Sequence, residues 1–428
     1  MSVTVVIGTQ WGDEAKGKFV DLLSQQAELT ARFNGGDNAG HTVVNPYGTF
    51  KLRLTPNGFA NPNTTCIIGP GVVVNLATLL AEIETIQQAG IALEERLWVS
   101  PRCHVVMPYH PRVEAIYERA KGKASTGTTG RGMGPVYADK VSYNGIRLAD
   151  LADEGVFAAR LRIQLEVKNA LLRAYGEEAL DFLSVYEEKL AQFARLRQMV
   201  REPFGLLQAA LQRGAEIVLE GAQGALLDND WGTYPYCTAS TTLAGGAAAG
   251  MGIAPRWINT VVGVAKAYTT RVGAGPMPTE LHDATGEAIR QAGAEFGTVT
   301  GRPRRCGWFD AALVRFTAQL NGCTRLALTK LDVLDGLPRI KIGMGYRPHA
   351  GPPAEYWEGD ARWLEACQPE YIELEGWQQP TKGILRWEQL PPLAQSYVRK
   401  IEELTGVPIG WVSVGPGRDE TIIVPNIS

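Results

Sequence analysis

The sequence predicts an α/β protein built around a parallel sheet. Apolar runs of strand length recur along the chain, and each is followed by glycine or polar loop residues. The first run leads through a glycine-containing loop into an apolar helical pattern, which is the usual start of a parallel sheet. The stretches between the runs are long enough for helical crossovers.

Five runs are expected to be strands, at residues 3–7, 216–219, 260–264, 325–328 and 407–414. Helical periodicity covers residues 76–89, 310–320 and 393–404, and a helix after the first strand carries Phe19, Val20, Leu22 and Leu23. The same periodicity fills most of residues 148–211, which predicts a helical subdomain there. We expect one α/β domain, residues 1–428, with this helical insertion.

Composition and charge exclude several classes of protein. Hydrophobic residues make up 45% of the 428 residues and charged residues 20%, as in a globular protein with a large core. A formal charge of −3 provides no basic surface for nucleic acid. Six scattered cysteines form no CxxC pair, so we expect neither a zinc site nor a disulfide framework. The chain has no signal-peptide pattern and no run of about 18 apolar residues, which predicts a cytoplasmic protein without a membrane span.

A glycine-rich loop follows the first predicted strand and has the spacing of a phosphate-binding loop. Its residues are Gly12, Asp13, Glu14, Ala15, Lys16, Gly17 and Lys18. Phe19 stands where the hydroxyl residue that binds Mg²⁺ normally follows, so Asp13 is the expected substitute as an oxygen ligand. Lysines at a helix start suit a phosphate group. The alternative is a glycine-rich turn with solvated lysines.

One of only five histidines, His41, lies in a polar loop at residues 34–42 rather than on an apolar helix face. A histidine in such a loop can act as an acid in catalysis. The alternative is an ordinary surface or core histidine.

The predicted strand at residues 325–328 is soon followed by Lys330, Leu331 and Asp332. The Asp332 carboxylate can accept hydrogen bonds from the N1–H and 2-amino groups of guanine, donors that adenine lacks in that arrangement. This motif therefore favours GTP over ATP. A solvated strand end is the alternative.

Residues 298–305 place three arginines and two threonines in a loop stiffened by proline. Arginine binds carboxylates and phosphates through two parallel hydrogen bonds, so the loop indicates a small anionic substrate. The alternative is a basic surface loop.

Taken in order, these segments and several others resemble the adenylosuccinate synthetase family over essentially the whole chain. The matching motifs are GTQWGD (8–13), NAGHT (38–42), GTTGRG (127–132), EGAQG (220–224), GTYPY (232–236), TRVGAGP (270–276), KLDVLDG (330–336) and LTGVP (404–408). So many motifs in one order do not arise by chance. The resemblance implies a large, mostly parallel central sheet flanked by helices, consistent with the strand pattern.

The resemblance also implies an activity. A homodimeric, Mg²⁺-dependent enzyme would join L-aspartate to IMP with GTP and release adenylosuccinate, GDP and phosphate in two steps. Asp13 would take the N1 proton of IMP, so that O6 attacks the γ-phosphoryl group of GTP and becomes a leaving group. His41 would hydrogen-bond the transferring group as an acid, and Lys16 would offset its charge. Mg²⁺ would lie between Asp13, the Gly40 carbonyl and phosphate oxygens.

The family's binding residues carry over to three sets of positions. The positions that match the IMP site are Asp13, Glu14, Ala15, Lys16, Asn38, Ala39, Gly40, His41, Thr129, Gln223, Thr238 and Arg302. Those that match the aspartate site are Thr298, Val299, Thr300, Gly301, Arg302, Pro303 and Arg304. Those that match the GTP site are Gly12, Asp13, Glu14, Ala15, Lys16, Gly17, Lys18, Gly40, His41, Thr42, Arg304, Lys330, Leu331, Asp332, Ser413, Val414 and Gly415.

Two positions depart from the family pattern. Ala15 replaces the usual glycine, which costs on the order of 1 kcal/mol if φ is positive there and nothing if φ is negative. Tyr143 stands where the family usually has an arginine that reaches across the dimer to the partner's IMP phosphate. Losing that charged hydrogen bond would weaken nucleotide binding by roughly 1.5–3 kcal/mol unless Arg131 or Arg147 replaces it.

The sequence leaves three alternative functions open. A related synthetase could use a guanine nucleotide instead of IMP, as some viral relatives do, although those relatives tend to lose the acid retained here as Asp13. A GTP-dependent switch would normally keep the P-loop hydroxyl and has no use for the arginine loop. A catalytically weakened paralogue is disfavoured because Asp13, Lys16, His41 and Arg302 all survive. Product analysis separates these functions.

Overall fold

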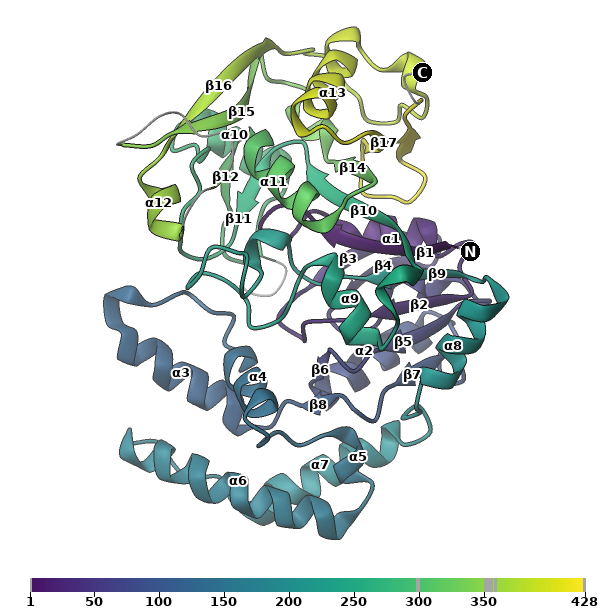
Figure 1. Ribbon diagram of the computed structural model, residues 1–428, viewed down its shortest axis with the longest axis vertical. Coiled ribbons are helices and arrows are strands. Elements are labelled where there is room, and N and C mark those ends of the chain that lie inside the picture. Colours follow the sequence, from purple (N-terminus) through teal and green to yellow (C-terminus); the bar gives the residue numbers. More distant parts are fainter. Residues whose placement is uncertain (1, 298–300, 350–356, 358–359, 426–428) are drawn as a thin grey trace.

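The computed structural model describes residues 2–297, 301–349, 357 and 360–425. At its centre a nine-stranded sheet has the order β18-β17-β14-β10-β1-β9-β2-β5-β7 (Figure 1). Neighbouring strands are parallel except β17 and β18, which are antiparallel. The predicted class, an α/β fold with a large, mostly parallel sheet flanked by helices, is confirmed.

The strands of the central sheet are β1 (Ser2–Gly8), β2 (Leu29–Arg32), β5 (Thr65–Ile68), β7 (Leu97–Val99), β9 (Glu216–Glu220), β10 (Ile258–Lys266), β14 (Arg325–Thr329), β17 (Ile409–Ser413) and β18 (Thr421–Ile423). Smaller sheets contain β3 (His41–Asn45) with β4 (Gly48–Leu52), β6 (Val73–Val74) with β8 (His104–Val105), β11 (Thr269–Arg271) with β12 (Arg305–Gly307), and β13 (Phe309–Asp310) with β15 (Arg339–Arg347) and β16 (Gln368–Glu375).

The α-helices are α1 (Lys16–Leu23), α2 (Leu76–Gln88), α3 (Tyr109–Lys121), α4 (Met133–Val141), α5 (Leu148–Leu151), α6 (Glu154–Ala174), α7 (Phe182–Leu196), α8 (Phe204–Arg213), α9 (Ala244–Met251), α10 (Ala284–Ala292), α11 (Ala311–Asn321), α12 (Ala361–Glu365) and α13 (Pro392–Thr405). The 3-10 helices are η1 (Asn57–Ala60), η2 (Gly122–Ala124), η3 (Ala225–Leu227), η4 (Pro255–Trp257), η5 (Leu331–Leu334) and η6 (Trp387–Gln389).

The five predicted strands correspond to β1, β9, β10, β14 and β17, with boundaries that agree within two residues. The apolar runs do not predict β2, β5, β7 or the antiparallel edge strand β18. Helices α5 to α8 fall in or next to the segment predicted to be helical, and Figure 1 shows α6 and α7 at the end of the molecule opposite α13.

Alternate side chains of β1 face opposite sides of the sheet, as the two-residue period of a strand requires. Val5 and Ile7 pack with buried residues of α8 and α9, whereas Val6 packs with Phe19 and Val20 of α1. Helices therefore cover both faces of the central strands.

The carboxyl ends of the parallel strands meet at one edge of the sheet, where α/β proteins bind ligands. The glycine-rich loop follows β1 there, Lys330 follows β14, and the segment from Val414 follows β17.

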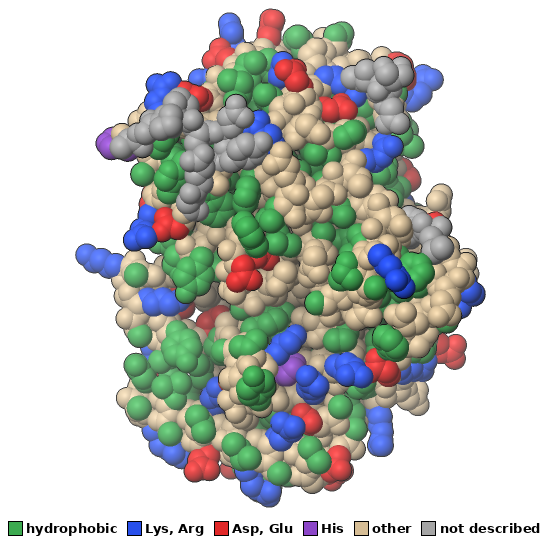
Figure 2. All heavy atoms as spheres, viewed as in Figure 1, with side chains coloured by type: hydrophobic (Ala, Val, Ile, Leu, Met, Phe, Trp, Pro, Cys, Tyr) green, Lys and Arg blue, Asp and Glu red, His purple; other side chains and the backbone are tan. Residues whose placement is uncertain are grey.

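On the face shown in Figure 2, basic and acidic side chains are interspersed over most of the surface. Among the helices that the structure describes, none has the length and apolarity needed to cross a bilayer.

Candidate active site

The glycine-rich loop after β1 is organised around the buried carboxylate of Glu14. One oxygen accepts a hydrogen bond from the backbone N–H of Gly12 at 2.8 Å, and the other lies 2.6 Å from Lys16 Nζ. Gly8 and Gly224 make room for this carboxylate, since a Cβ atom on either residue would lie within 2.5 Å of its oxygens. The loop conformation therefore depends on a carboxylate beneath it that is paired with Lys16.

Ala15 lies in the left-handed region, with φ of 64° and ψ of 35°. A residue with a Cβ atom is strained there by roughly 1–2 kcal/mol, whereas glycine is not. The departure from the family's glycine therefore carries a backbone cost.

We expect Ala15→Gly to raise the free energy of unfolding by about 0.5–1 kcal/mol, because the strain relieved exceeds the entropy that glycine adds to the unfolded chain. Urea unfolding measures the difference. The matched control is Ala159→Gly at an exposed position inside α6, which should lower the free energy of unfolding by about 1 kcal/mol. If both variants were destabilised, Ala15 would not be strained.

Lys18 is buried, and its ammonium group is fully used within the protein. It donates hydrogen bonds to Ser413 Oγ at 2.6 Å and to the carbonyl oxygens of Gly415 and Glu420, both at 2.8 Å. Burial lowers the pKa of Lys18 to about 8. This lysine therefore joins the glycine-rich loop to the segment after β17, which is expected to hold guanine.

His41 begins β3 and lies beside Glu220 at the carboxyl end of β9, with 3.9 Å between His41 Nδ1 and Glu220 Oε1. Burial, reinforced by the charges of Arg32 and Lys16, lowers the pKa of His41 to about 3. Burial also raises the pKa of Glu220 to about 7. Within the described part of the chain, His41 Nε2 is buried without a hydrogen-bond partner. The imidazole is therefore neutral at pH 7 and keeps one ring nitrogen for a ligand.

Two more buried atoms of expected site residues, Asn38 Oδ1 and Asp332 Oδ1, have no hydrogen-bond partner among the described residues. An unpaired buried polar group costs about 1–3 kcal/mol, so folded proteins keep few of them without a reason. Burial raises the pKa of Asp332, which lies in η5 just after β14. With His41 Nε2, these atoms mark places where a ligand would complete the hydrogen bonding.

Gln223 and Thr238, both expected to bind IMP, lie together. Gln223 Nε2 donates to Thr238 Oγ1 at 3.3 Å, and Gln223 Oε1 accepts from Ser240 Oγ at 3.4 Å. A Cβ atom on Gly12 would lie 3.8 Å from the Gln223 backbone. This pair therefore borders the glycine-rich loop.

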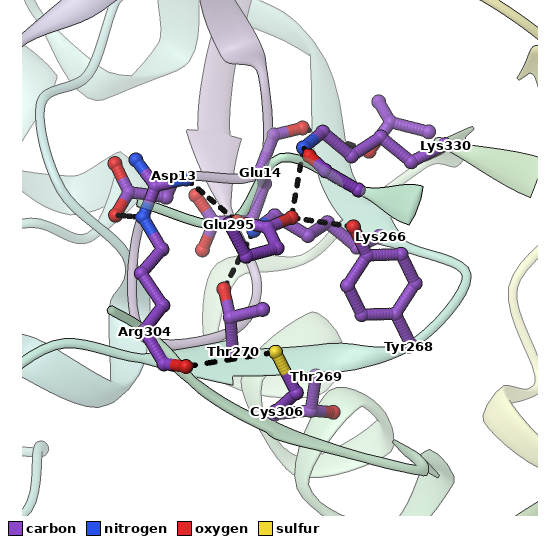
Figure 3. A network of polar contacts seen from close by, with 12 residues as sticks. Asp13, Glu14, Lys266, Tyr268, Thr269, Thr270, Glu295, Arg304, Cys306 and Lys330 are labelled. Carbon is purple, nitrogen blue, oxygen red and sulfur yellow. Dashed lines mark hydrogen bonds and ion pairs between the residues drawn. The ribbon is translucent and has the colours of Figure 1, made fainter. Parts of the chain in front are cut away.

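Arg304, from the arginine loop, lies beside the expected base. Its Nε atom is 2.9 Å from Asp13 Oδ2, and its Nη1 atom is 2.6 Å from Glu295 Oε2 (Figure 3). The structure thus brings Asp13 and Arg304 together from distant parts of the sequence.

Other expected residues, Thr42, Thr129, Gly301, Arg302 and Pro303, are exposed. Thr298, Val299 and Thr300 lie outside the described residues.

Three residues of this network, Lys266, Tyr268 and Glu295, are not predicted by the sequence motifs. Lys266 ends β10, and a lysine at the carboxyl end of a buried strand is the one sequence feature that could have indicated a site residue there. Tyr268 and Glu295 belong to none of the motifs that were singled out. Glu220 stands in the EGAQG motif, but its position beside His41 depends on the folded chain.

Tyr143 follows α4 and is 92% exposed, with φ of 68°. Large aromatic side chains are usually at least partly buried. This exposure leaves the tyrosine available to a second copy of the chain.

A parallel sheet with a glycine-rich loop after its first strand, and with buried acids and unpaired polar atoms at its carboxyl edge, defines a nucleotide-binding enzyme. The profile of the adenylosuccinate synthetase family matches residues 5–422. The chain therefore belongs to the adenylosuccinate synthetase family, which makes it a ligase of purine nucleotide biosynthesis that uses GTP.

Individual relatives agree with this assignment. The chain is 48% identical to adenylosuccinate synthetase of Carboxydothermus hydrogenoformans over 428 residues, which covers 100% of both chains. It is 48% identical to that of Heliobacterium modesticaldum over 423 residues, 99% of each. The structure of fully ligated adenylosuccinate synthetase from Plasmodium falciparum matches with a TM-score of 0.94 at 35% identity, covering 99% of this chain and 100% of that one.

A more distant structure shares the fold alone. Succinoaminodeoxyadenylate synthetase of cyanophage S-2L, solved with dGMP and dATP, matches with a TM-score of 0.63 at 20% identity, covering 99% of this chain and 96% of that one.

Proposed function

We propose that this enzyme ligates L-aspartate to IMP through a 6-phosphoryl-IMP intermediate and releases adenylosuccinate, GDP and phosphate. The observation that carries the proposal is the set of buried atoms on Asn38, His41 and Asp332 that have no partner in the described part of the chain. All three belong to residues expected at the two nucleotides. A carboxylate oxygen suits the N–H donors of guanine, and an imidazole N–H suits the oxygens of a phosphoryl group.

In the first step Asp13 accepts the N1 proton of IMP, and O6 bonds to the γ-phosphorus of GTP as GDP leaves with the electron pair. The Arg304 guanidinium, 2.9 Å from Asp13 Oδ2, helps to orient the carboxylate for this step. In the second step the amino group of L-aspartate bonds to C6 and releases a proton, and the bond from C6 to the phosphorylated oxygen breaks with its electron pair going to phosphate. Phosphate leaves more readily than an unphosphorylated oxygen would.

The residues present also fit Mg²⁺. Asp13 offers a carboxylate and Gly40 a carbonyl, which are the hard oxygen donors that Mg²⁺ combines with water and substrate phosphates. Groups of three or more His, Cys, Asp or Glu side chains that could hold a metal are absent from the described residues. When bound, the ion supplies positive charge to the transferring phosphoryl group.

We also propose that the enzyme is a cytoplasmic homodimer. Val141 and Tyr143, two positions apart, are 71% and 92% exposed, which supports a contact between copies. Six free cysteines support a reducing compartment.

The proposal is tested by mixing the purified protein with IMP, GTP, L-aspartate and Mg²⁺ and quantifying products by chromatography. Adenylosuccinate, GDP and phosphate are expected in equal amounts. The same assay is repeated with GMP in place of IMP. Turnover with GMP and none with IMP would overturn the substrate assignment.

Tyr143→Arg is expected to lower the KM for IMP by about tenfold or more, because a hydrogen bond from a charged group to the partner's IMP phosphate is worth roughly 1.5–3 kcal/mol. Steady-state kinetics with varied IMP measures this change. Tyr175→Arg, at another exposed tyrosine at the end of α6, should leave the KM unchanged. Equal responses of the two variants would argue against a contact of residue 143 with IMP.

A further inference from the structure

Glu295 lies at the centre of a buried charge network that joins separate parts of the site (Figure 3). Its side chain is fully buried. Oε1 accepts hydrogen bonds from Lys266 Nζ at 2.9 Å, from Lys330 Nζ at 2.8 Å and from the Tyr268 hydroxyl. Oε2 accepts one from Arg304 Nη1 at 2.6 Å. A single carboxylate thus holds donors from four different residues.

The network contains more positive than negative charge. Lys266, Lys330 and Arg304 surround Glu295, and Asp13 adds a second negative charge through Arg304. Burial alone would raise the pKa of the Glu295 carboxyl, but these cations hold it well below its usual range. A buried ion cluster that only stabilises the fold gains most when its charges are matched. An excess cation suits a place that receives anionic substrates.

The partners of Glu295 come from different positions along the edge of the sheet. Lys266 ends β10, which lies between β14 and β1. Lys330 follows β14, has a left-handed φ of 57°, and leads directly into η5 with Asp332. Arg304 precedes β12, and its backbone N–H donates to the Glu295 carbonyl at 2.9 Å. Glu295 therefore holds Arg304 through both side chain and backbone.

We propose that Glu295 is a positioning residue whose two carboxylate oxygens fix Lys330 at the guanine end of the site and Arg304 beside Asp13 at the aspartate end. The inference rests on the proposed function, which assigns these two ends. Loosening Glu295 should weaken GTP and L-aspartate binding together. IMP binding should change little, because Gln223 and Thr238, two of its expected ligands, bond to one another outside this network, and Asp13 meets it only through Arg304.

Steady-state kinetics of Glu295→Gln test the proposal. The amide keeps the size of the side chain but replaces one acceptor oxygen with an N–H₂ group. A lysine or arginine facing that group has no lone pair and cannot accept its hydrogen bond. We expect the KM for GTP and the KM for L-aspartate each to rise about tenfold, with the KM for IMP within about twofold of the wild type. Tyr268→Phe removes one donor and keeps the ring, so it should fold normally and raise the same two constants about threefold.

The matched control is Asp310→Asn. Asp310 is also buried, and its partners, the Tyr346 hydroxyl at 2.7 Å and the Leu313 N–H at 3.1 Å, are not among the expected site residues. It should lower the Tm without changing any KM.

The outcomes separate a positioning role from a structural one. If Glu295→Gln and Tyr268→Phe lower only the Tm and kcat, or raise all three KM values alike, the inference is overturned. The wild-type enzyme is assayed first, since absence of its product would refute the proposed function. Unchanged KM values in active variants would refute only the role of Glu295.

Discussion

Asp13→Asn is expected to lower kcat by about 10³-fold, because the amide keeps the shape of the side chain but cannot accept the N1 proton of IMP. The ion pair with Arg304 is lost as well, so the arginine no longer has a charged partner on the loop. GTP should still bind through Asp332. Initial rates of adenylosuccinate formation, measured together with equilibrium GTP binding, distinguish lost chemistry from lost affinity.

Controls for Asp13 address its two expected roles. Glu178→Gln, at an exposed carboxylate between α6 and α7, should leave kcat within about twofold of the wild type. Asp13 is also an expected Mg²⁺ ligand, so the variant is assayed over a range of Mg²⁺ concentrations. Recovery of the rate at high Mg²⁺ would assign the residue to metal binding alone. If the variant kept more than about a tenth of kcat, the base would lie elsewhere.

The strands that the sequence predicts are those with uninterrupted apolar runs. Strand β2 was not predicted because it contains the charged residue Arg32, which interrupts the apolar run although the whole strand is buried. The guanidinium of Arg32 donates to backbone carbonyls, including that of Gly36 at 3.0 Å, so its burial is compensated by contacts that no local pattern reveals. Strands β5 and β7 have only four and three residues.

The candidate site could likewise be predicted only in part, namely where its motifs are local in the sequence. Loops at the ends of predicted strands could be located from glycine, histidine and aspartate patterns, because each motif is local. The positive φ of Ala15 could not be predicted, because nothing in the sequence distinguishes an alanine in the left-handed conformation from any other alanine. Lys18 was expected near phosphate, yet its donors go to Ser413 and two carbonyls far along the chain. Glu295 depends on partners 29 or more residues away on Lys266 and Lys330, and only folding brings them together.

Asp332→Asn is expected to raise the KM for GTP by about 10³-fold. The buried Asp332 Oδ1 has no partner among the described residues, and the carboxylate can accept both N–H donors of guanine. Each such bond to a charged acceptor is worth roughly 1.5–3 kcal/mol, and an amide offers one acceptor and one unsuitable donor instead. The KM for L-aspartate and the KM for IMP should change little. Steady-state kinetics with each substrate varied in turn measure all three.

The same substitution should improve the use of a different nucleotide, which rules out misfolding as the cause of the loss. Xanthosine triphosphate has a C2 carbonyl where guanine has an amino group, so the new side-chain amide can donate to it. Its KM is therefore expected to be lower with Asp332→Asn than with the wild type. Asp335→Asn is the matched control, because Asp335 bonds Trp377 and Thr381 within the protein and should leave the preference for GTP intact. If Asp332→Asn still preferred GTP with an unchanged KM, the guanine base would be held by other residues, and the role of Lys330 beside Glu295 would need a different explanation.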